Sequence, residues 1–236
     1  MVLMIIVLSA TAKAGQYHFT LQGGAGGQDL PSSAQYYDVL SNASSSGQPY
    51  NEGDTYNWVW RIAGGYAVDI TSKFSLGYDF GYAALSNPNT TYMDTQSDND
   101  FANKYTWTAN WTASYIDLLA TTQYKLTQRF SLLGDVGIAE IMQKVNWQLM
   151  QTQFPRVGPG PIENELGAGS TMAHKLAPEI VLGLGYQISS YVDVNLTYNY
   201  IFADNIGFSE SELSGITNSH KVATISNTFL GVNFLF

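Results

Sequence analysis

A turn sequence that occurs three times constrains most strongly how this chain of 236 residues can fold. The copies lie at residues 70–76, 126–132 and 188–194, and in each of them a few polar residues separate apolar ones. On both sides of every copy, apolar residues alternate with small or polar residues, a pattern typical of a β-strand with two different faces. Each copy therefore predicts a tight turn between two antiparallel strands.

Eight strands of this kind can be placed along the chain. They lie at about residues 17–27, 56–70, 73–84, 108–126, 129–143, 173–188, 191–203 and 221–236. All of them reach or exceed the roughly 9–11 residues that a tilted strand needs to cross a bilayer. Between the short turns lie four long segments rich in Asn, Ser, Gly, Asp and Pro, at about residues 28–55, 85–107, 144–172 and 204–220. We therefore predict an all-β protein, an eight-stranded antiparallel up-and-down transmembrane β-barrel with short periplasmic turns and long extracellular loops.

The two faces of the strands indicate which one meets lipid. In the strand at 191–203, one face carries Val194, Leu196 and Tyr198, whereas the other carries Asn195 and Thr197. A soluble β-sandwich also alternates, but its polar face usually carries many long charged side chains. Here only 12% of residues are charged and 14% are aromatic. Small polar residues suit a narrow lumen, so we assign the aromatic face to lipid.

Composition excludes several other classes of protein. The formal net charge of −9 argues against nucleic acid as a partner. The chain has no cysteine, which excludes disulfides and thiolate metal sites. The continuous apolar run at residues 2–8 is far shorter than the roughly 20 residues of a transmembrane helix. Followed by Ala12-Lys13-Ala14, this run predicts a signal peptide over residues 1–14 and a barrel over 15–236, although a buried first strand is the alternative.

Aromatic residues near the strand ends predict two interfacial girdles. On the loop side these residues are Trp58, Trp60, Trp107, Trp111 and Tyr200, and on the turn side they are Tyr66, Phe74, Tyr124, Phe130 and Tyr186. The short turns also carry the basic residues Lys73, Lys125 and Arg129, whereas the long loops are acidic.

The end of the sequence carries a recognisable pattern. Leu230, Val232, Phe234 and Phe236 alternate toward one face. This series resembles the C-terminal signal by which bacterial outer-membrane barrels are recognised by the barrel-assembly machinery. Together with the strand and loop pattern, the chain resembles small outer-membrane barrels of the OmpA (transmembrane domain) and OmpX type. The resemblance implies the bacterial outer membrane, with lipid and lipopolysaccharide around the barrel. The even number of strands predicts that both termini are periplasmic.

Charged residues are also predicted inside the barrel. By alternation, the inward positions include Arg61, Asp79, Asp117, Asp135, Lys175, Glu179 and Asp193. Charges in a narrow interior must be paired or hydrated. A barrel of eight strands is just wide enough for its own side chains, which favours an ion-pair network around Arg61. A pathway that prefers cations is the alternative.

Candidate catalytic and metal-binding groups are few. The three histidines are His18, His174 and His220, and none forms the His-x-Ser pair on a late strand that lipid A deacylases use. Ser219 and His220 would point to opposite faces of a strand, whereas His18 shares a face with Thr20 at the turn-side end. The acidic loop residues Asp94, Asp98 and Asp100 do not match a calcium loop. We therefore expect no catalytic residue, no cofactor and no metal.

The function predicted from the sequence is non-enzymatic. An integral outer-membrane barrel of this kind would support envelope integrity and present acidic loops to a host or surface ligand. The first alternative is a narrow porin-like channel for small cations or small hydrophobic solutes. The second alternative is a lipid-modifying enzyme of the outer membrane.

Overall fold

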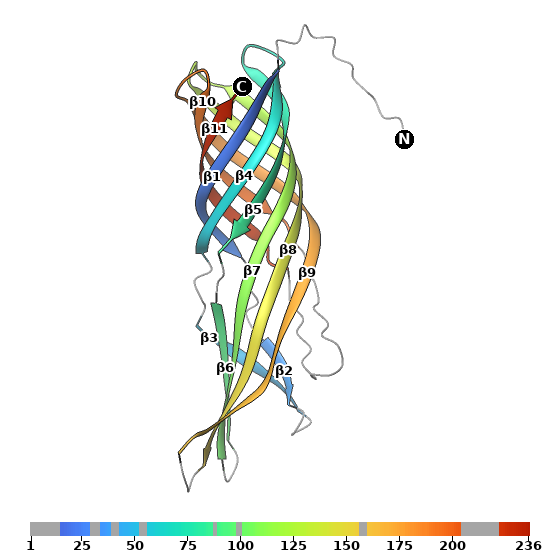
Figure 1. Cartoon of the computed structure of the whole chain (residues 1–236), viewed down its shortest axis with the longest axis vertical. Coiled ribbons are helices and arrows are strands. Elements are labelled where there is room, and N and C mark those ends of the chain that lie inside the picture. The colour runs from blue at the N-terminus through green and yellow to red at the C-terminus, as the bar shows by residue number, and fades with distance from the viewer. Residues whose placement is uncertain are drawn as a thin grey trace, which may run out of the picture.

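The protein folds into strands that belong to one antiparallel sheet (Figure 1). The computed structural model describes residues 15–28, 34–38, 43–51, 56–86, 89–97, 101–155, 160–203 and 222–236. The strands are β1 (Gln16–Gln28), β2 (Ala34–Asp38), β3 (Ala43–Asn51), β4 (Tyr56–Asp69), β5 (Phe74–Leu85), β6 (Asn89–Ser97), β7 (Phe101–Lys125), β8 (Phe130–Pro155), β9 (Ile162–Gln187), β10 (Val192–Ile201) and β11 (Ile225–Leu235). No helix in the described ranges is long and apolar enough to cross a membrane.

Eight of these strands close into a ring. The order β7-β5-β4-β1-β11-β10-β9-β8 is completed by pairing of β7 with β8, and every neighbouring pair is antiparallel. Closure between the first and last strands runs from His18 opposite Leu235 to Gln28 opposite Ile225. A closed ring leaves no unpaired backbone edge within the bilayer, where no water could satisfy one. The predicted eight-stranded barrel is confirmed.

The three repeated sequences form tight turns at one end of the barrel, which we call the turn end. The backbone N–H of Ile70 donates to the carbonyl of Phe74 at 2.9 Å, and the same bond recurs between Leu126 and Phe130 at 2.9 Å. The hydroxyl of Thr71 also accepts from the N–H of Phe74 at 2.9 Å. Thr127 repeats that contact in the second turn at 3.0 Å. A hydroxyl at this position stabilises the turn locally, which explains why the sequence recurs.

The opposite end, the loop end, holds more strand than the sequence predicted. The segments expected to be loops contain β2, β3 and β6, and β8 and β9 continue to Pro155 and from Ile162. β7 and β8 pair without a break from Lys125–Ser131 to Phe101–Pro155, and both strands reach far beyond the barrel in Figure 1. The expectation of long loops at 28–55, 85–107 and 144–172 was therefore wrong in part. The extension of β8 keeps an alternation, because Val145, Trp147 and Leu149 are buried while Asn146 and Gln148 are exposed. The prediction of loops followed the polar composition of these segments and overlooked this pattern. The segment 204–220 lies outside the described residues.

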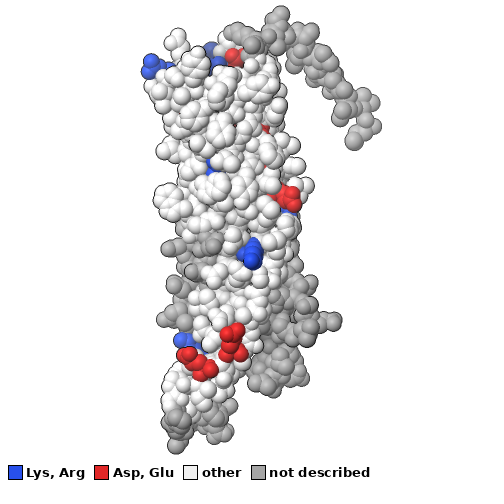
Figure 2. Space-filling model, viewed as in Figure 1, with Lys and Arg blue, Asp and Glu red and all other residues white. Residues whose placement is uncertain are grey.

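The outer face of the barrel is apolar, as the alternation predicted. Phe80, Val136 and Leu182 point outward and are each more than half exposed. The barrel surface seen in Figure 2 is accordingly mostly uncharged. On β8, apolar and glycine residues fill the outward positions from Phe130 to Ile138, and the next outward residue is Glu140. The C-terminal series lies on the same face, with Leu230, Phe234 and Phe236 exposed and Val232 half-buried.

The aromatic girdles are present, with one correction. On the loop side Trp58 is 79% exposed, and Trp60 is also exposed, whereas Tyr200 is half-buried. On the turn side, Tyr124 and Phe130 are exposed, and Tyr66, Phe74 and Tyr186 are half-buried. Trp111 was wrongly placed in the girdle, because it is 0% exposed and lies inside. β7 alternates without a bulge, so Trp111 shares the inward face of Tyr115 and Asp117. The side chain of Trp107 lies outside the described residues.

The first described strand begins and the last one ends at the turn end, since the N–H of Phe236 donates to the carbonyl of Tyr17 at 2.9 Å. If the turn end faces the periplasm, a cysteine in place of Gly160 should react on intact cells with a polyethylene-glycol maleimide too large for porins. Gly160 is exposed with open space around it, and the chain has no native cysteine to interfere. The matched variant Ser72→Cys, in an exposed turn, should react only after the outer membrane is permeabilised. Labelling of Ser72→Cys alone on intact cells would reverse the orientation.

Candidate functional site: the charged lumen

Three predicted lumen residues meet inside the barrel on neighbouring strands. Arg61 lies on β4, Asp79 on β5 and Asp117 on β7, and all three side chains point inward and are buried. Gly81 lies opposite Asp117 in the β5–β7 pair. A Cβ atom at Gly81 would lie 2.6 Å from both Arg61 Nη2 and Asp117 Oδ1. Glycine at this position therefore makes the space in which the guanidinium and the carboxylate meet.

Arg61 binds Asp117 through two parallel hydrogen bonds. Its Nε donates to Asp117 Oδ2 at 2.8 Å, and its Nη2 donates to Asp117 Oδ1 at 2.6 Å. Nη2 also donates to Asp79 Oδ2 at 3.2 Å, and Nη1 donates to Gln22 Oε1 at 3.0 Å. The exposed fractions are 5% for Arg61 and 1% for Asp117. This bidentate arrangement is the strong, geometrically specific form of the arginine–carboxylate pair.

The network continues from Asp79 and Gln22 to other strands. His18 Nε2 lies 2.9 Å from Asp79 Oδ1. Gln22 Nε2 donates to Asn195 Oδ1 and Thr197 Oγ1, each at 3.3 Å, which reaches β10. His18 was considered from the sequence only as a catalytic candidate. Its alternation with Thr20 and Gln22 on β1 was the signal that it faces the lumen.

A second polar cluster surrounds Glu179 on β9. Asn199 Nδ2 donates to Glu179 Oε1 and also to Tyr115 Oη, the latter at 3.3 Å. Asn227 Nδ2 donates to the same Tyr115 oxygen at 3.1 Å. All four side chains are buried. Arg61 forms ion pairs with Asp79 and Asp117, and no ion pair among the described residues includes Glu179.

The other residues predicted to face the lumen form no ion pair with Arg61. Asp135 accepts a hydrogen bond from the backbone N–H of Thr122 at 3.2 Å. Asp193 is half-buried, and its Oδ1 has no hydrogen-bond partner. Lys175 is half-buried on β9, four residues before Glu179. The structure thus brings two of the five predicted carboxylates to Arg61 and leaves the other three outside its ion pairs.

A cavity of about 200 Å³ occupies the turn-side half of the lumen. Its lining extends from the turn residues Thr127 and Arg129 inward to Arg61, Asn199 and Phe229. His18, Asp79, Asp135 and Asp193 also line it. The cavity is therefore a polar well that reaches the turn end and is bounded inside by the Arg61 network.

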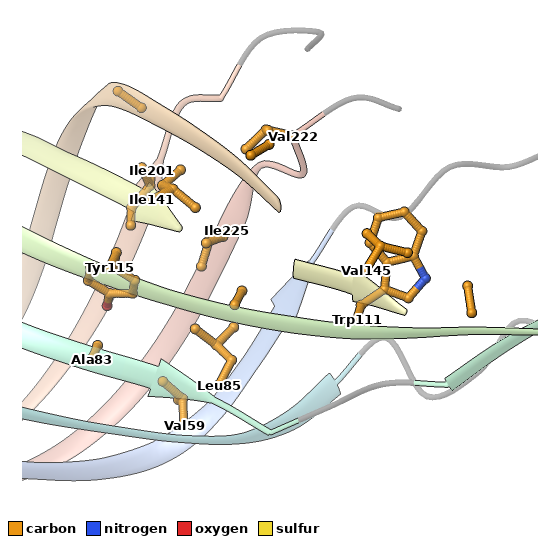
Figure 3. Packing of buried hydrophobic residues seen from close by; sticks show 14 of the residues in the cluster. Val59, Ala83, Leu85, Trp111, Tyr115, Ile141, Val145, Ile201, Val222 and Ile225 are labelled. Atoms are coloured by element: carbon orange, nitrogen blue, oxygen red, sulfur yellow. The ribbon is translucent and has the colours of Figure 1, made fainter. Parts of the chain in front are cut away.

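An apolar layer fills the lumen on the loop side of Arg61 (Figure 3). Val59, Ile141, Ile201, Ile225 and Phe229 belong to this cluster, and each is at most 1% exposed. The sequence predicted a lumen filled by ion pairs and missed this layer. Val59 and Ile201 sit between aromatic residues of the outer face, so no contrast between the two faces marked them.

Farther toward the loop end, tryptophans extend the interior. Trp147 packs over glycines of β9, because a Cβ atom at Gly169 would lie 2.7 Å from its Cζ2 atom. Gln143 Nε2 donates to Gln28 Oε1 at 2.9 Å, linking β8 to β1 inside the barrel. The described lumen therefore consists of a polar well, a charged layer and an apolar layer in sequence from the turn end.

Replacement of Arg61 by alanine should destabilise the barrel by about 3–5 kcal/mol, because removing one partner of a buried pair strands the other charge. Urea titration of the folded protein in lipid vesicles would measure this loss. The control Arg129→Ala removes an exposed arginine whose Nη1 contacts only the Tyr186 hydroxyl, at 3.2 Å, and should change stability far less. Equal losses in the two variants would contradict a buried network.

Comparisons with known proteins agree with this architecture. Residues 1–233 match the model of the family described as the outer membrane protein beta-barrel domain. No curated protein matches the sequence.

Among solved structures, OprG of Pseudomonas aeruginosa is 14% identical, with 95% of this chain and 97% of that chain covered and a TM-score of 0.50. Ail of Yersinia pestis is 11% identical, with coverages of 93% and 98% and a TM-score of 0.37. Neisserial surface protein A is 14% identical, with coverages of 92% and 97% and a TM-score of 0.29. At these identities the likeness shows the fold alone. The chain belongs to the outer-membrane protein beta-barrel family, as its resemblance to small outer-membrane barrels implied.

Proposed function

We propose that this outer-membrane barrel is a non-enzymatic structural protein of the envelope that presents its loop-end sheet to a host or surface ligand. The observation that carries the proposal is the filled lumen. The Arg61–Asp117 pair and the apolar layer follow one another along the barrel. A barrel packed in this way is a rigid anchor, stabilised from inside like a protein core.

The loop-end sheet supplies the surface for contact. β7, β8 and β9 continue past the outward apolar positions that end before Glu140, so their loop-end parts would stand above the bilayer. Glu163 and Glu165 are exposed there, and Gln148 Nε2 donates to Glu165 Oε2 at 3.2 Å. The long segments at this end are acidic in sequence, which suits a ligand that carries donors or positive charge. Lipopolysaccharide would surround the barrel below it, with the termini and short turns in the periplasm.

A narrow channel for small cations is the second candidate. The turn-side cavity favours it, because Asp79, Asp135 and Asp193 line a polar well that opens at the turn end. Conduction would require this well to continue past Arg61 and Phe229. Both residues are at most 5% exposed and belong to packed clusters. We therefore favour the structural role.

A lipid-modifying activity has weaker support. His18 faces Asp79, while the neighbouring Thr20 hydroxyl donates to Asn233 Oδ1 at 2.8 Å, so the histidine and hydroxyl have separate partners. On the outer face, His174 Nδ1 lies 3.8 Å from Glu140 Oε1, with both side chains about half exposed. That distance is too long for a hydrogen bond. A nucleophilic site needs a hydroxyl bonded to the histidine, and mass spectra of lipid A from cells with and without the protein would detect any modification.

Planar-bilayer recordings test the structural role against the channel. The wild-type protein should show no steady conductance, because the lumen is closed by two layers. Phe229→Ala removes a ring from the inner boundary of the cavity and should produce measurable currents. The matched control Phe234→Ala, on the outward face of the same strand, should stay silent. A steady cation-selective current through the wild-type protein would overturn the structural role and favour the channel.

A further inference from the structure

The polar cluster around Glu179 contains oxygen atoms that the protein leaves without partners. Glu179 Oε2 and Asn199 Oδ1 are both buried and make no hydrogen bond. The exposed fractions are only 1% for Glu179 and 2% for Asn199. A buried acceptor without a donor costs free energy, and the cost is larger when the acceptor carries charge. The two oxygens therefore point to a bound group that this cluster receives.

The two side chains are held together by their other polar atoms. Asn199 Nδ2 donates to Glu179 Oε1 and to Tyr115 Oη, which holds the amide in place. Asn227 Oδ1 also has no hydrogen-bond partner. It faces β1, where a Cβ atom at Gly26 would lie 2.1 Å away, so this oxygen lies against backbone. Asn227 Nδ2 supports Tyr115 at 3.1 Å. Asn227 and Tyr115 thus position Asn199, and Glu179 and Asn199 supply the free oxygens.

Charge indicates the nature of the missing group. Arg61 Nε and Nη2 donate to Asp117 and Asp79, and its Nη1 donates to Gln22. Among the described residues no ion pair reaches Glu179. One carboxylate without a cationic partner matches a single positive charge. Divalent metal sites usually gather more carboxylate ligands than this.

We propose that Glu179 Oε2 and Asn199 Oδ1 bind a monovalent metal cation of the sodium type at the inner end of the turn-side cavity. Oxygen atoms are the ligands that hard cations prefer. Of the two ligands only Asn199 lines the cavity that reaches the turn end. The ion would therefore enter past Asn199 and take its remaining ligands from water. A proton on Glu179 Oε2 that is donated to Asn199 Oδ1 is the competing occupant, because it would neutralise the charge and satisfy both oxygens. The sodium measurements below distinguish it from a metal ion. A water molecule would satisfy the oxygens but leave the charge uncompensated.

Direct binding on the folded full-length protein in detergent tests the site. Equilibrium dialysis with radioactive sodium, at constant ionic strength maintained with choline chloride, should show one saturable site per chain. At saturation, the unfolding temperature should exceed that in choline alone by about 2–4 °C, because a ligand that binds only the folded state stabilises it. Glu179→Gln should weaken binding by about tenfold or more. Asn199→Ala, which removes the neutral oxygen and leaves the charge, should also weaken it.

The matched control is Glu140→Gln, which makes the same chemical change on the outward face of β8 and should bind sodium like the wild type. Absence of saturable binding to the wild-type protein would overturn the proposal, whether or not the variants fold. Equal binding by Glu179→Gln would also overturn it. An unfolding temperature that varies with pH but is the same in sodium and in choline would assign the cluster to a proton alone.

Discussion

The buried pairing of Arg61 with Asp117 is the interaction on which the arrangement of the lumen depends. A guanidinium removed from water must satisfy its donors inside the protein, and Arg61 does so through Asp117, Asp79 and Gln22. These partners come from β7, β5 and β1, on both sides of β4, so the bonds require the observed register of four strands. A shift of one residue in any of these strands would turn its partner toward lipid.

The charged layer also separates two environments within the barrel. On its turn side lies the polar cavity, lined by Asp135 and Asp193 among others. On its loop side, Ile141, Ile201 and Ile225 form a dry apolar layer. The combination explains how a narrow barrel can contain an excess of carboxylates and still be packed. The pairing with Arg61 compensates two of them, and the cavity leaves room for water or a small cation beside the others.

Much of this architecture could be predicted from the sequence, and the failures have physical causes. The threonine-stabilised turns and strict alternation on β5, β7 and β10 gave the ring and placed Arg61 beside inward carboxylates. The alternation of apolar and polar residues cannot distinguish the two faces of a strand where the inward and outward residues are both apolar. Val59 and Ile201 were therefore overlooked between aromatic residues of the outer face. The loop-end parts of β8 and β9 were taken for loops because they are rich in polar residues and glycine. Trp111 was misplaced because aromatic identity was weighed above its parity on the strand. The partners of Glu179 depend on contacts among β7, β9, β10 and β11, which no local pattern encodes.

A double-mutant cycle between Arg61 and Asp117 tests the central claim most directly. Unfolding free energies would be measured for the wild type, Arg61→Ala, Asp117→Ala and the double variant under identical conditions. A buried bidentate pair predicts that the double variant loses less stability than the sum of the single losses, with a coupling of about 1–3 kcal/mol. Losses that add to within about 0.5 kcal/mol would show that the two residues act independently. That result would contradict a lumen organised around this pair.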